Sequence, residues 1–107
     1  MSDGPEKTIQ ASIDFLKQDR PLRAEEICRN YLEKSPGSLD HLRLLGQALL
    51  KQGRTSEAEH YLRLALDIEP DFPQLHEDIG SAYAMQSKYE EAITAFQRAL
   101  ELQPTLP

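Results

Sequence analysis

Three prolines divide this chain into equal lengths. Pro36, Pro70 and Pro104 stand 34 positions apart. An internal period of about 20 to 50 residues is typical of stacked repeats, in which each unit buries its apolar face against its neighbours. The period therefore constrains the fold more than any single motif, and a repeat architecture is the first hypothesis to examine.

Other columns of residues stay in register when the chain is shifted by the same 34 positions. The columns present in all three copies are Gln18, Gln52 and Gln86; Ala24, Ala58 and Ala92; Leu32, Leu66 and Leu100; and the basic set Arg20, Arg54 and Lys88. No insertion interrupts them. We therefore expect one domain over 1–107 made of three units, about 5–38, 39–72 and 73–106, and we expect it to be part of a longer protein.

Each unit predicts two helices. Leu42, Leu45 and Leu49 recur at helical spacing, and a second apolar series follows the turn at Gly53. Proline pushes the residue before it out of the helical region, so each second helix should end before its proline. The pattern predicts helices over 6–18, 22–34, 39–52, 55–68, 73–86 and 89–101, joined by short turns into antiparallel hairpins. Thr55 and Ser87 are the expected N-caps.

This pattern resembles the tetratricopeptide repeat (TPR) family. The third unit carries the family signature at His76, Ile79, Gly80, Tyr83, Ala92, Phe96, Ala99 and Pro104, and the second at Leu42, Leu45, Gly46, Leu49, Ala58, Leu62, Ala65 and Pro70. The first is degenerate, with Thr8, Ala11, Ser12, Phe15, Ala24, Cys28, Tyr31 and Pro36. The resemblance covers nearly the whole chain and implies an all-α fold, a right-handed α-solenoid of three antiparallel helix hairpins.

Small residues should set the spacing of the helices within each hairpin. Gly46 should allow close approach, with Ala58 opposite it and Leu62 one turn further on. In the first unit Ser12 replaces this glycine, so we expect that hairpin to be splayed or rotated. Cys28 occupies the Leu62 position, and we interpret it as a small buried hydrophobe rather than a reactive thiol.

The resemblance also implies a function. First helices of such units line a concave groove that binds an extended segment of a protein partner. The groove candidates here are Glu6, Ile9, Ile13, Lys17, Asp40, Arg43, Gln47, Lys51, Gln74, Glu77, Ser81 and Met85. Members that bind chaperones hold a terminal carboxylate with cations, but this chain has Asp78 at one such position, which argues against that activity.

Ile9, Ile13 and Leu16 form an apolar stripe with two interpretations. The stripe is either an apolar contact for a partner or part of the core. The second interpretation is favoured, because apolar stripes at helical spacing usually face the core.

The last helix should expose an apolar face, because repeat arrays normally finish with a polar capping element. Ile93, Leu100 and Leu102 are expected to lie on this face. Either the chain continues into a further helix, or two copies cover each other. These three residues are therefore the candidate self-association end.

Composition and missing motifs exclude other classes of function. The chain has 12 basic and 18 acidic side chains, a net charge of −6, which argues against nucleic-acid and anionic-membrane partners. The three histidines are too scattered for a metal site, and the sequence has no phosphate loop or nucleophile elbow. We expect no catalysis, no cofactor and no membrane span. The single cysteine and the polar start favour the cytoplasm.

Two alternatives remain beside the scaffold. Residues 24–29 and 70–73 look similar to repeats that precede bacterial sulfotransferase or glycosyltransferase domains, so the chain could be an accessory region of such an enzyme. It could also be an oligomerisation unit. The basic column Arg20, Arg54 and Lys88 is interpreted as a complement to helix dipoles rather than as a charged binding edge.

Overall fold

The computed structural model describes residues 4–104, which form six α-helices and no strand. The helices are α1 (Pro5–Lys17), α2 (Pro21–Lys34), α3 (Leu39–Lys51), α4 (Thr55–Ile68), α5 (Pro73–Met85) and α6 (Tyr89–Leu102). Every predicted helix is confirmed, with each boundary within one residue of its expected position. The ends of the expected domain (1–107) and of the third unit (73–106) lie outside the described residues.

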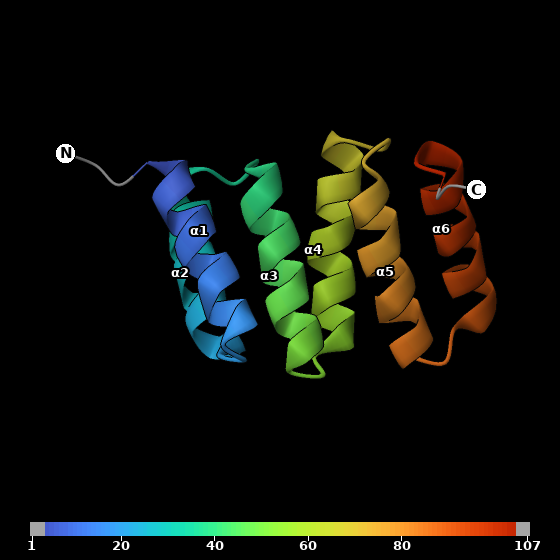
Figure 1. Cartoon of the computed structure of the whole chain (residues 1–107), viewed down its shortest axis with the longest axis horizontal. Coiled ribbons are helices and arrows are strands. Elements are labelled where there is room, and N and C mark those ends of the chain that lie inside the picture. The colour runs from blue at the N-terminus through green and yellow to red at the C-terminus, as the bar shows by residue number, and fades with distance from the viewer. Residues whose placement is uncertain (1–3, 105–107) are drawn as a thin grey trace.

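The six helices form three antiparallel hairpins arranged side by side, a right-handed α-solenoid (Figure 1). The molecule measures 44 × 26 × 25 Å, with the hairpins following one another along its long axis (Figure 1). First helices contact one another from hairpin to hairpin, α1 with α3 and α3 with α5. These three helices therefore form one continuous face.

The same tight turn closes every first helix. Asp19, Gly53 and Ser87 have φ angles of 58°, 74° and 62°, so the chain enters the left-handed region at the same place in each unit. A left-handed residue after a helix allows later N–H groups to bond the last free carbonyls. The N–H of Arg54 donates to the Leu49 carbonyl at 2.9 Å, and the equivalent bonds recur in the other two units.

The predicted N-caps are wrong. Thr55 is the first helical residue of α4, and Ser87 belongs to the left-handed turn before α6. The N-cap positions are held instead by Arg54 and Lys88, with no side-chain cap bond. The tight turn uses the residue after the left-handed position as the cap, and this leaves no place for a capping hydroxyl.

Helix approach within the second hairpin depends on Gly46. A Cβ at this position would lie 2.7 Å from Cγ of Leu62, closer than side-chain carbons approach in proteins. In the third hairpin, a Cβ at Gly80 would lie 2.8 Å from the Phe96 ring. The nearest side chains to the two glycines are therefore Leu62 and Phe96, which we expected one turn further on.

The first hairpin closes with different residues. Ser12 and Cys28 are both fully buried, with Oγ 3.5 Å from Sγ, and the Ser12 hydroxyl donates to the Thr8 carbonyl at 2.8 Å. Serine is larger than glycine, but Cys28 is smaller than the leucine at the matching place. The two changes act in opposite directions, and the two side chains touch between α1 and α2. Cys28 is fully buried, as expected for a small buried hydrophobe, and burial raises the pKa of its thiol.

Candidate functional site

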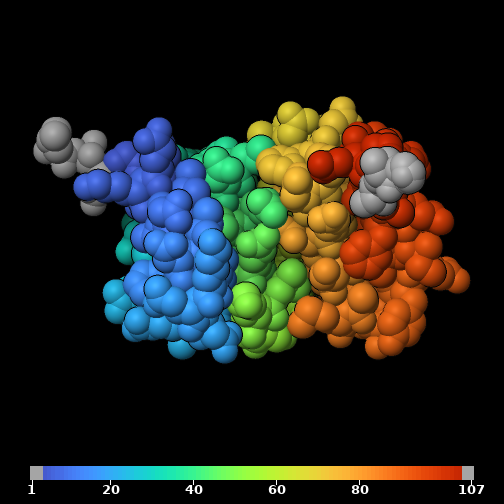
Figure 2. All heavy atoms as spheres, in the orientation of Figure 1, coloured from blue at the N-terminus to red at the C-terminus, as the bar shows by residue number. Residues whose placement is uncertain are grey.

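The residues predicted for the groove lie on α1, α3 and α5. Figure 2 shows the face that these helices form, with α3 between α1 and α5. A hollow of about 300 Å³ lies between α1 and α3 and is lined by Ile13, Leu16, Lys17, Gln47 and Lys51. Four of these five are predicted groove residues. The sequence pattern thus brought together two cations and an apolar side chain at one end of the face.

The apolar stripe on α1 is divided between its two interpretations. Leu16 is buried and belongs to the core. Ile9 and Ile13 are partly buried and pack against that core. Because Ile13 also lines the hollow, it supports the helix packing and remains accessible to a partner.

An ion pair joins α3 to α5 at the centre of the face. Nε of Arg43 lies 3.1 Å from Oδ2 of Asp78, and Nε2 of Gln47 donates to the same oxygen at 3.3 Å. The Arg43 guanidinium also lies 5.6 Å from the centre of the Phe72 ring. Burial raises the pKa of the Asp78 carboxyl, while Arg43 and Gln47 act to lower it. Two predicted groove residues are therefore already engaged in joining α3 to α5.

The remaining candidates are spread along the face. Glu6, Asp40 and Met85 are exposed, whereas Gln74 and Ser81 are half-buried. The Ser81 hydroxyl donates to the backbone carbonyl of Glu77 at 3.2 Å. Glu77 itself lines a separate hollow, of about 530 Å³, with Phe96 and Leu100 at the last hairpin.

Sequence reasoning missed a polar network that joins each hairpin to the next. Glu25 on α2 accepts from Nε2 of Gln52 at 2.9 Å, from Arg54 at 2.8 Å and from Arg29 at 2.8 Å. Glu59 on α4 accepts from Gln86 at 3.0 Å and Arg63 at 2.9 Å, and lies 3.6 Å from Nζ of Lys88. We call the two sets the inter-hairpin clamps.

Each clamp holds its carboxylate in the charged form. Burial acts to raise the pKa of Glu25 and of Glu59. The amide of the glutamine and the nearby cations act in the opposite direction, and the resulting pKa of each glutamate is below its ordinary value. Each clamp is therefore a charge-assisted hydrogen-bond network rather than a solvent-exposed ion pair.

The signal for the clamps was present in the sequence. Glu25 and Glu59 stand 34 positions apart, and the Gln and basic columns provide their partners. The basic column therefore bonds the preceding hairpin in addition to any effect on helix dipoles. Arg20, in the first hairpin, lies over the Phe15 ring at 5.2 Å.

The clamp position of the third unit is Ile93, in a column that otherwise holds glutamate. Ile93 is 56% exposed, Leu100 is 51% exposed and Phe96 is 37% exposed, on one side of α6 together with exposed Tyr89. Leu102 is half-buried. The last hairpin therefore presents an apolar face where the others present a carboxylate, and we call it the α6 face.

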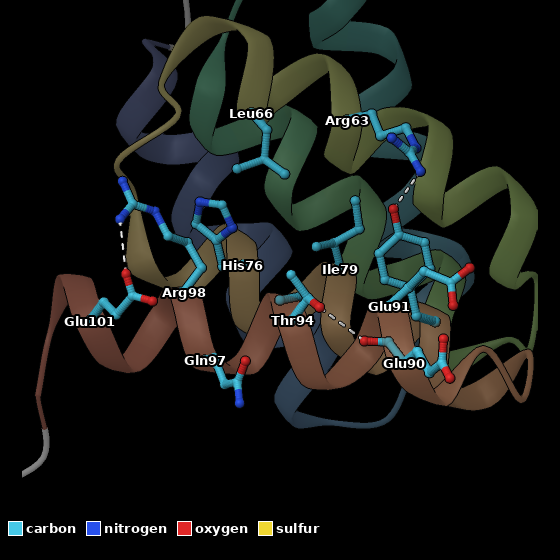
Figure 3. Close-up of a pocket in the computed structure, with 12 residues that line it drawn as sticks. Arg63, Leu66, His76, Ile79, Glu90, Glu91, Thr94, Gln97, Arg98 and Glu101 are labelled. Atoms are coloured by element: carbon cyan, nitrogen blue, oxygen red, sulfur yellow. Dashed lines mark hydrogen bonds and ion pairs between the residues drawn. The ribbon is translucent and has the colours of Figure 1, made fainter.

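A second groove lies between α4 and α6, with α5 below it. Its volume is about 650 Å³, and its lining includes Leu66, His76, Ile79, Ala95 and Arg98. Figure 3 shows Leu66 and Ile79 between a charged end at Arg98 and Glu101 and another at Arg63, Glu90 and Glu91. We call it the α4–α6 groove.

Comparison with known proteins gives a family for this geometry. The family model described as tetratricopeptide repeat matches the sequence over residues 9–71 and again over 43–107. The chain belongs to the tetratricopeptide repeat family. Proteins of TPR architecture serve in general as protein-interaction scaffolds, and the predicted family and fold class are confirmed. The chain has no significant match among curated proteins.

Solved TPR structures show the same arrangement of helices. The first TPR domain of human RPAP3 superposes with a TM-score of 0.87 at 20% identity, covering 92% of this chain and 78% of that one. MamA from Desulfovibrio magneticus RS-1 gives 0.84 at 25% identity, covering 94% and 57%. An O-GlcNAc transferase mutant from Thermobaculum terrenum gives 0.86 at 27% identity, covering 97% and 21%. The TPR chain thus spans little more than half of MamA and about a fifth of the transferase.

Two further features of the TPR chain concern membranes and metals. Among the described residues, no helix combines the length and apolarity that a bilayer span requires. Within residues 4–104, no three side chains of the ligating types gather closely enough to hold a metal ion.

Proposed function

We propose that this TPR chain is a scaffold that binds an extended segment of a partner protein along the face of α1, α3 and α5, without catalysis or a cofactor. The observation that carries the proposal is the hollow between α1 and α3. Ile13 and Leu16 give it an apolar floor, and Lys17 and Lys51 give it two exposed cations. This combination suits a partner segment with an acidic residue beside an apolar one.

The ion pair at the centre of the face affects where the acidic residue of a partner segment can bind. Arg43 is already bonded to Asp78, so a partner carboxylate gains little from that cation. Lys17 and Lys51 make no ion pair within residues 4–104 and lie at the α1 end, while Glu77 and Met85 lie on α5. We therefore expect the acidic part of the segment to lie at α1 and its apolar or basic part toward α5.

Selection of displayed random dodecapeptides against the folded chain tests this proposal. We expect the selected peptides to share an acidic residue next to an apolar one, and to lose at least tenfold in affinity for the double variant Lys17→Glu and Lys51→Glu. Lys34→Glu, on α2, is the matched control and should bind as the native chain does. Peptides that bind the double variant as tightly as the native chain would contradict the proposal.

A second proposal concerns the α6 face, which we infer is a surface through which two copies associate. Tyr89, Ile93, Phe96 and Leu100 follow one another at spacings of four, three and four residues, the seam along which helices pair. The glutamine and basic columns supply the partners of the clamps, and in the first hairpin they hold Gln18 and Arg20. Neither side chain is apolar, so neither matches the apolar α6 face. Pairing of α6 with α6 would bury this apolar seam against a second copy of itself.

Light scattering over a concentration series checks this second proposal. We expect the mass to rise toward two chains with concentration, and we expect Leu100→Glu to return it to one chain with unchanged helix content. Leu22→Glu, an exposed leucine on α2, is the control that should leave the mass of the dimer unchanged. A native chain that stays monomeric at millimolar concentration would contradict self-association.

The enzyme-linked alternative is not favoured. The transferase similarity covers the TPR fold and 21% of that protein, so its activity belongs to the larger chain. The family match is to the repeats alone. We further propose that the scaffold acts in the cytoplasm, as the composition suggested, and cell fractionation with an antibody against the chain would test this location.

A further inference from the structure

We propose that the α4–α6 groove is a second docking surface, which binds a partner-protein segment carrying an aromatic side chain next to a lysine or arginine. This surface lies on the second helices, opposite the face of α1, α3 and α5. The proposal is therefore independent of partner binding in the predicted groove. It rests on a comparison between two equivalent grooves of the same chain.

The equivalent groove between α2 and α4 is largely filled from within. Tyr61 lies in it, with its ring centre 5.4 Å from the Arg29 guanidinium and its hydroxyl accepting from Arg29 at 2.9 Å. Leu32 and Leu45 line the groove beside this ring. The remaining volume is about 320 Å³. The chain itself thus shows what such a groove accommodates: an aromatic ring over aliphatic side chains, next to a cation.

The α4–α6 groove lacks this ring. The residue 34 positions after Tyr61 is Ala95, and the open volume is about 650 Å³, twice that of the first groove. Tyr83 from α5 takes over the bond to Arg63, at one end. Leu66, Ile79 and Ala95 remain as an apolar floor along the rest, as Figure 3 shows for the first two.

The α4–α6 groove also differs from the first in how one carboxylate is paired. In the first groove Glu57 is bonded by Arg54 at 2.8 Å and lies 3.4 Å from Arg29. The equivalent carboxylate in the third unit is Glu91. It makes no ion pair within the described residues 4–104, because the side chains of Lys88 and Arg63 both contact Glu59 instead. Glu90 beside it is also without an ion pair in that part of the chain, so two carboxylates at this end of the groove are left without a salt-bridge partner, although Arg63 lines the same end.

These two differences indicate which kind of partner segment would complement the groove in shape and charge. An aromatic ring placed over Ala95 would bury the aliphatic floor, and a neighbouring lysine or arginine would meet Glu90 and Glu91. An acidic segment would be repelled at this end. A purely aliphatic segment would leave both carboxylates unpaired. Among partner segments, the chemistry therefore selects a basic and aromatic one.

The test is a titration of the isotope-labelled chain with the synthetic peptide acetyl-GSKYKSG-amide, followed by two-dimensional NMR. We expect saturable shifts centred on the amides of Leu66, Ile79 and Ala95. Replacing the peptide's tyrosine with alanine, or its lysines with glutamates, should weaken binding at least tenfold. Salt should weaken it further, because the charged end of the groove is solvent-exposed.

Variants of the chain test whether the peptide binds specifically in the α4–α6 groove. Ala95→Tyr fills the groove as Tyr61 fills its equivalent and should remove binding, while Glu91→Gln, at an exposed position, should weaken it severalfold without any effect on folding. Glu26→Gln, on the exposed side of α2, is the control that should bind normally. No saturable binding of the peptide to the native chain overturns the proposal. The proposal is also overturned if Glu91→Gln binds the peptide as tightly as the native chain does, or if the peptide shifts the NMR signals of α1 and α3 instead.

Discussion

At the scale of single residues, the glycine at the centre of a hairpin shows how packing depends on what faces it. Gly46 and Gly80 occupy the same column, but Leu62 is fully buried whereas Phe96 is 37% exposed. A new methyl group at position 46 would meet Cγ of Leu62, which has no room to move. At position 80 it would meet a ring that can turn toward solvent.

We therefore predict that Gly46→Ala destabilises the chain by about 1–3 kcal/mol, the usual cost of overpacking. Gly80→Ala should cost less, because the Phe96 ring can move away from the new methyl group, whereas the gain of roughly 1 kcal/mol in helix propensity applies to both variants. Chemical denaturation of both variants measures the difference. Adding Leu62→Cys, which copies the pairing in the first hairpin, should make the cost of Gly46→Ala smaller. Equal losses for the two alanine variants would contradict this explanation.

His41 is a second residue whose effect depends on its surroundings. Its ring is fully buried, stacks on Tyr31 with centres 3.8 Å apart, and bonds Thr8 at 2.7 Å and Ser38 at 2.6 Å. Burial lowers the pKa of His41, although the nearby Asp40 acts to raise it. The folded chain therefore holds this ring neutral at a pH where the unfolded chain begins to protonate it.

The sign of the pH effect follows from this depressed pKa. The unfolded chain binds the extra proton as pH falls through about 6.5, the usual histidine value, so the free energy of unfolding should fall between pH 7 and 5. We predict that His41→Leu, which copies Leu75 of the next unit, removes most of this slope. Urea denaturation at several pH values measures it, with His60→Gln as the exposed control. A slope unchanged in His41→Leu would contradict the prediction.

At the scale of helices, the inter-hairpin clamps join α2 to the turn before α4, and α4 to the turn before α6. The side chain of Glu59 is 16% exposed, so its hydrogen bonds to charged and amide donors are only partly screened by water. Such bonds fix where one hairpin lies on the next. Apolar contacts alone would allow the hairpins to slide, because dispersion and burial have little directional preference.

We predict that Glu59→Gln lowers the free energy of unfolding by about 1.5–3 kcal/mol at pH 7, the range for hydrogen bonds to charged groups. The folded-state pKa of Glu59 is lowered, so the native clamp is fully stabilising above the ordinary glutamate pKa. Its contribution is lost as pH falls through the folded value. The difference between native and variant chains should therefore vanish in acid.

Glu101→Gln is the control for the clamp. Glu101 also faces an arginine, Arg98, at 3.4 Å, but its side chain is 65% exposed. Exposed pairs contribute roughly 0–1 kcal/mol, so its replacement should change stability little. If both variants lost the same stability, the clamp would be no more than an ordinary surface pair.

At the scale of the whole molecule, stability should be highest in the middle of the stack. In α3, seven residues are buried: His41, Leu42, Leu44, Leu45, Gly46, Ala48 and Leu49. In α6 the buried residues are Ala92, Ala95 and Ala99, and in α1 they are Ser12 and Leu16. Units of a repeat protein are stabilised by their neighbours, and the terminal helices have a neighbour on one side only.

We predict that amide hydrogen exchange is slowest in α3 and faster in α1 and α6, since terminal helices open without unfolding the rest. Exchange followed by NMR at low protein concentration measures this order. Raising the concentration should slow α6 specifically if copies pair through the α6 face. Uniform protection across the six helices would show instead that the chain unfolds as one unit.

The sequence alone determined the architecture of this TPR protein, because a strict 34-residue period and helical spacing of apolar residues leave few other ways to bury the core. Three of the residues that it predicted for a groove, Ile13, Lys17 and Lys51, line one hollow on the first helices, and their binding role stays a prediction. What the tertiary structure decided depends on contacts between residues of different units. Gly46 meets Leu62, Arg43 meets Asp78, and the clamps form across hairpins. These distances arise from how helices settle on one another, and a periodic pattern does not contain them.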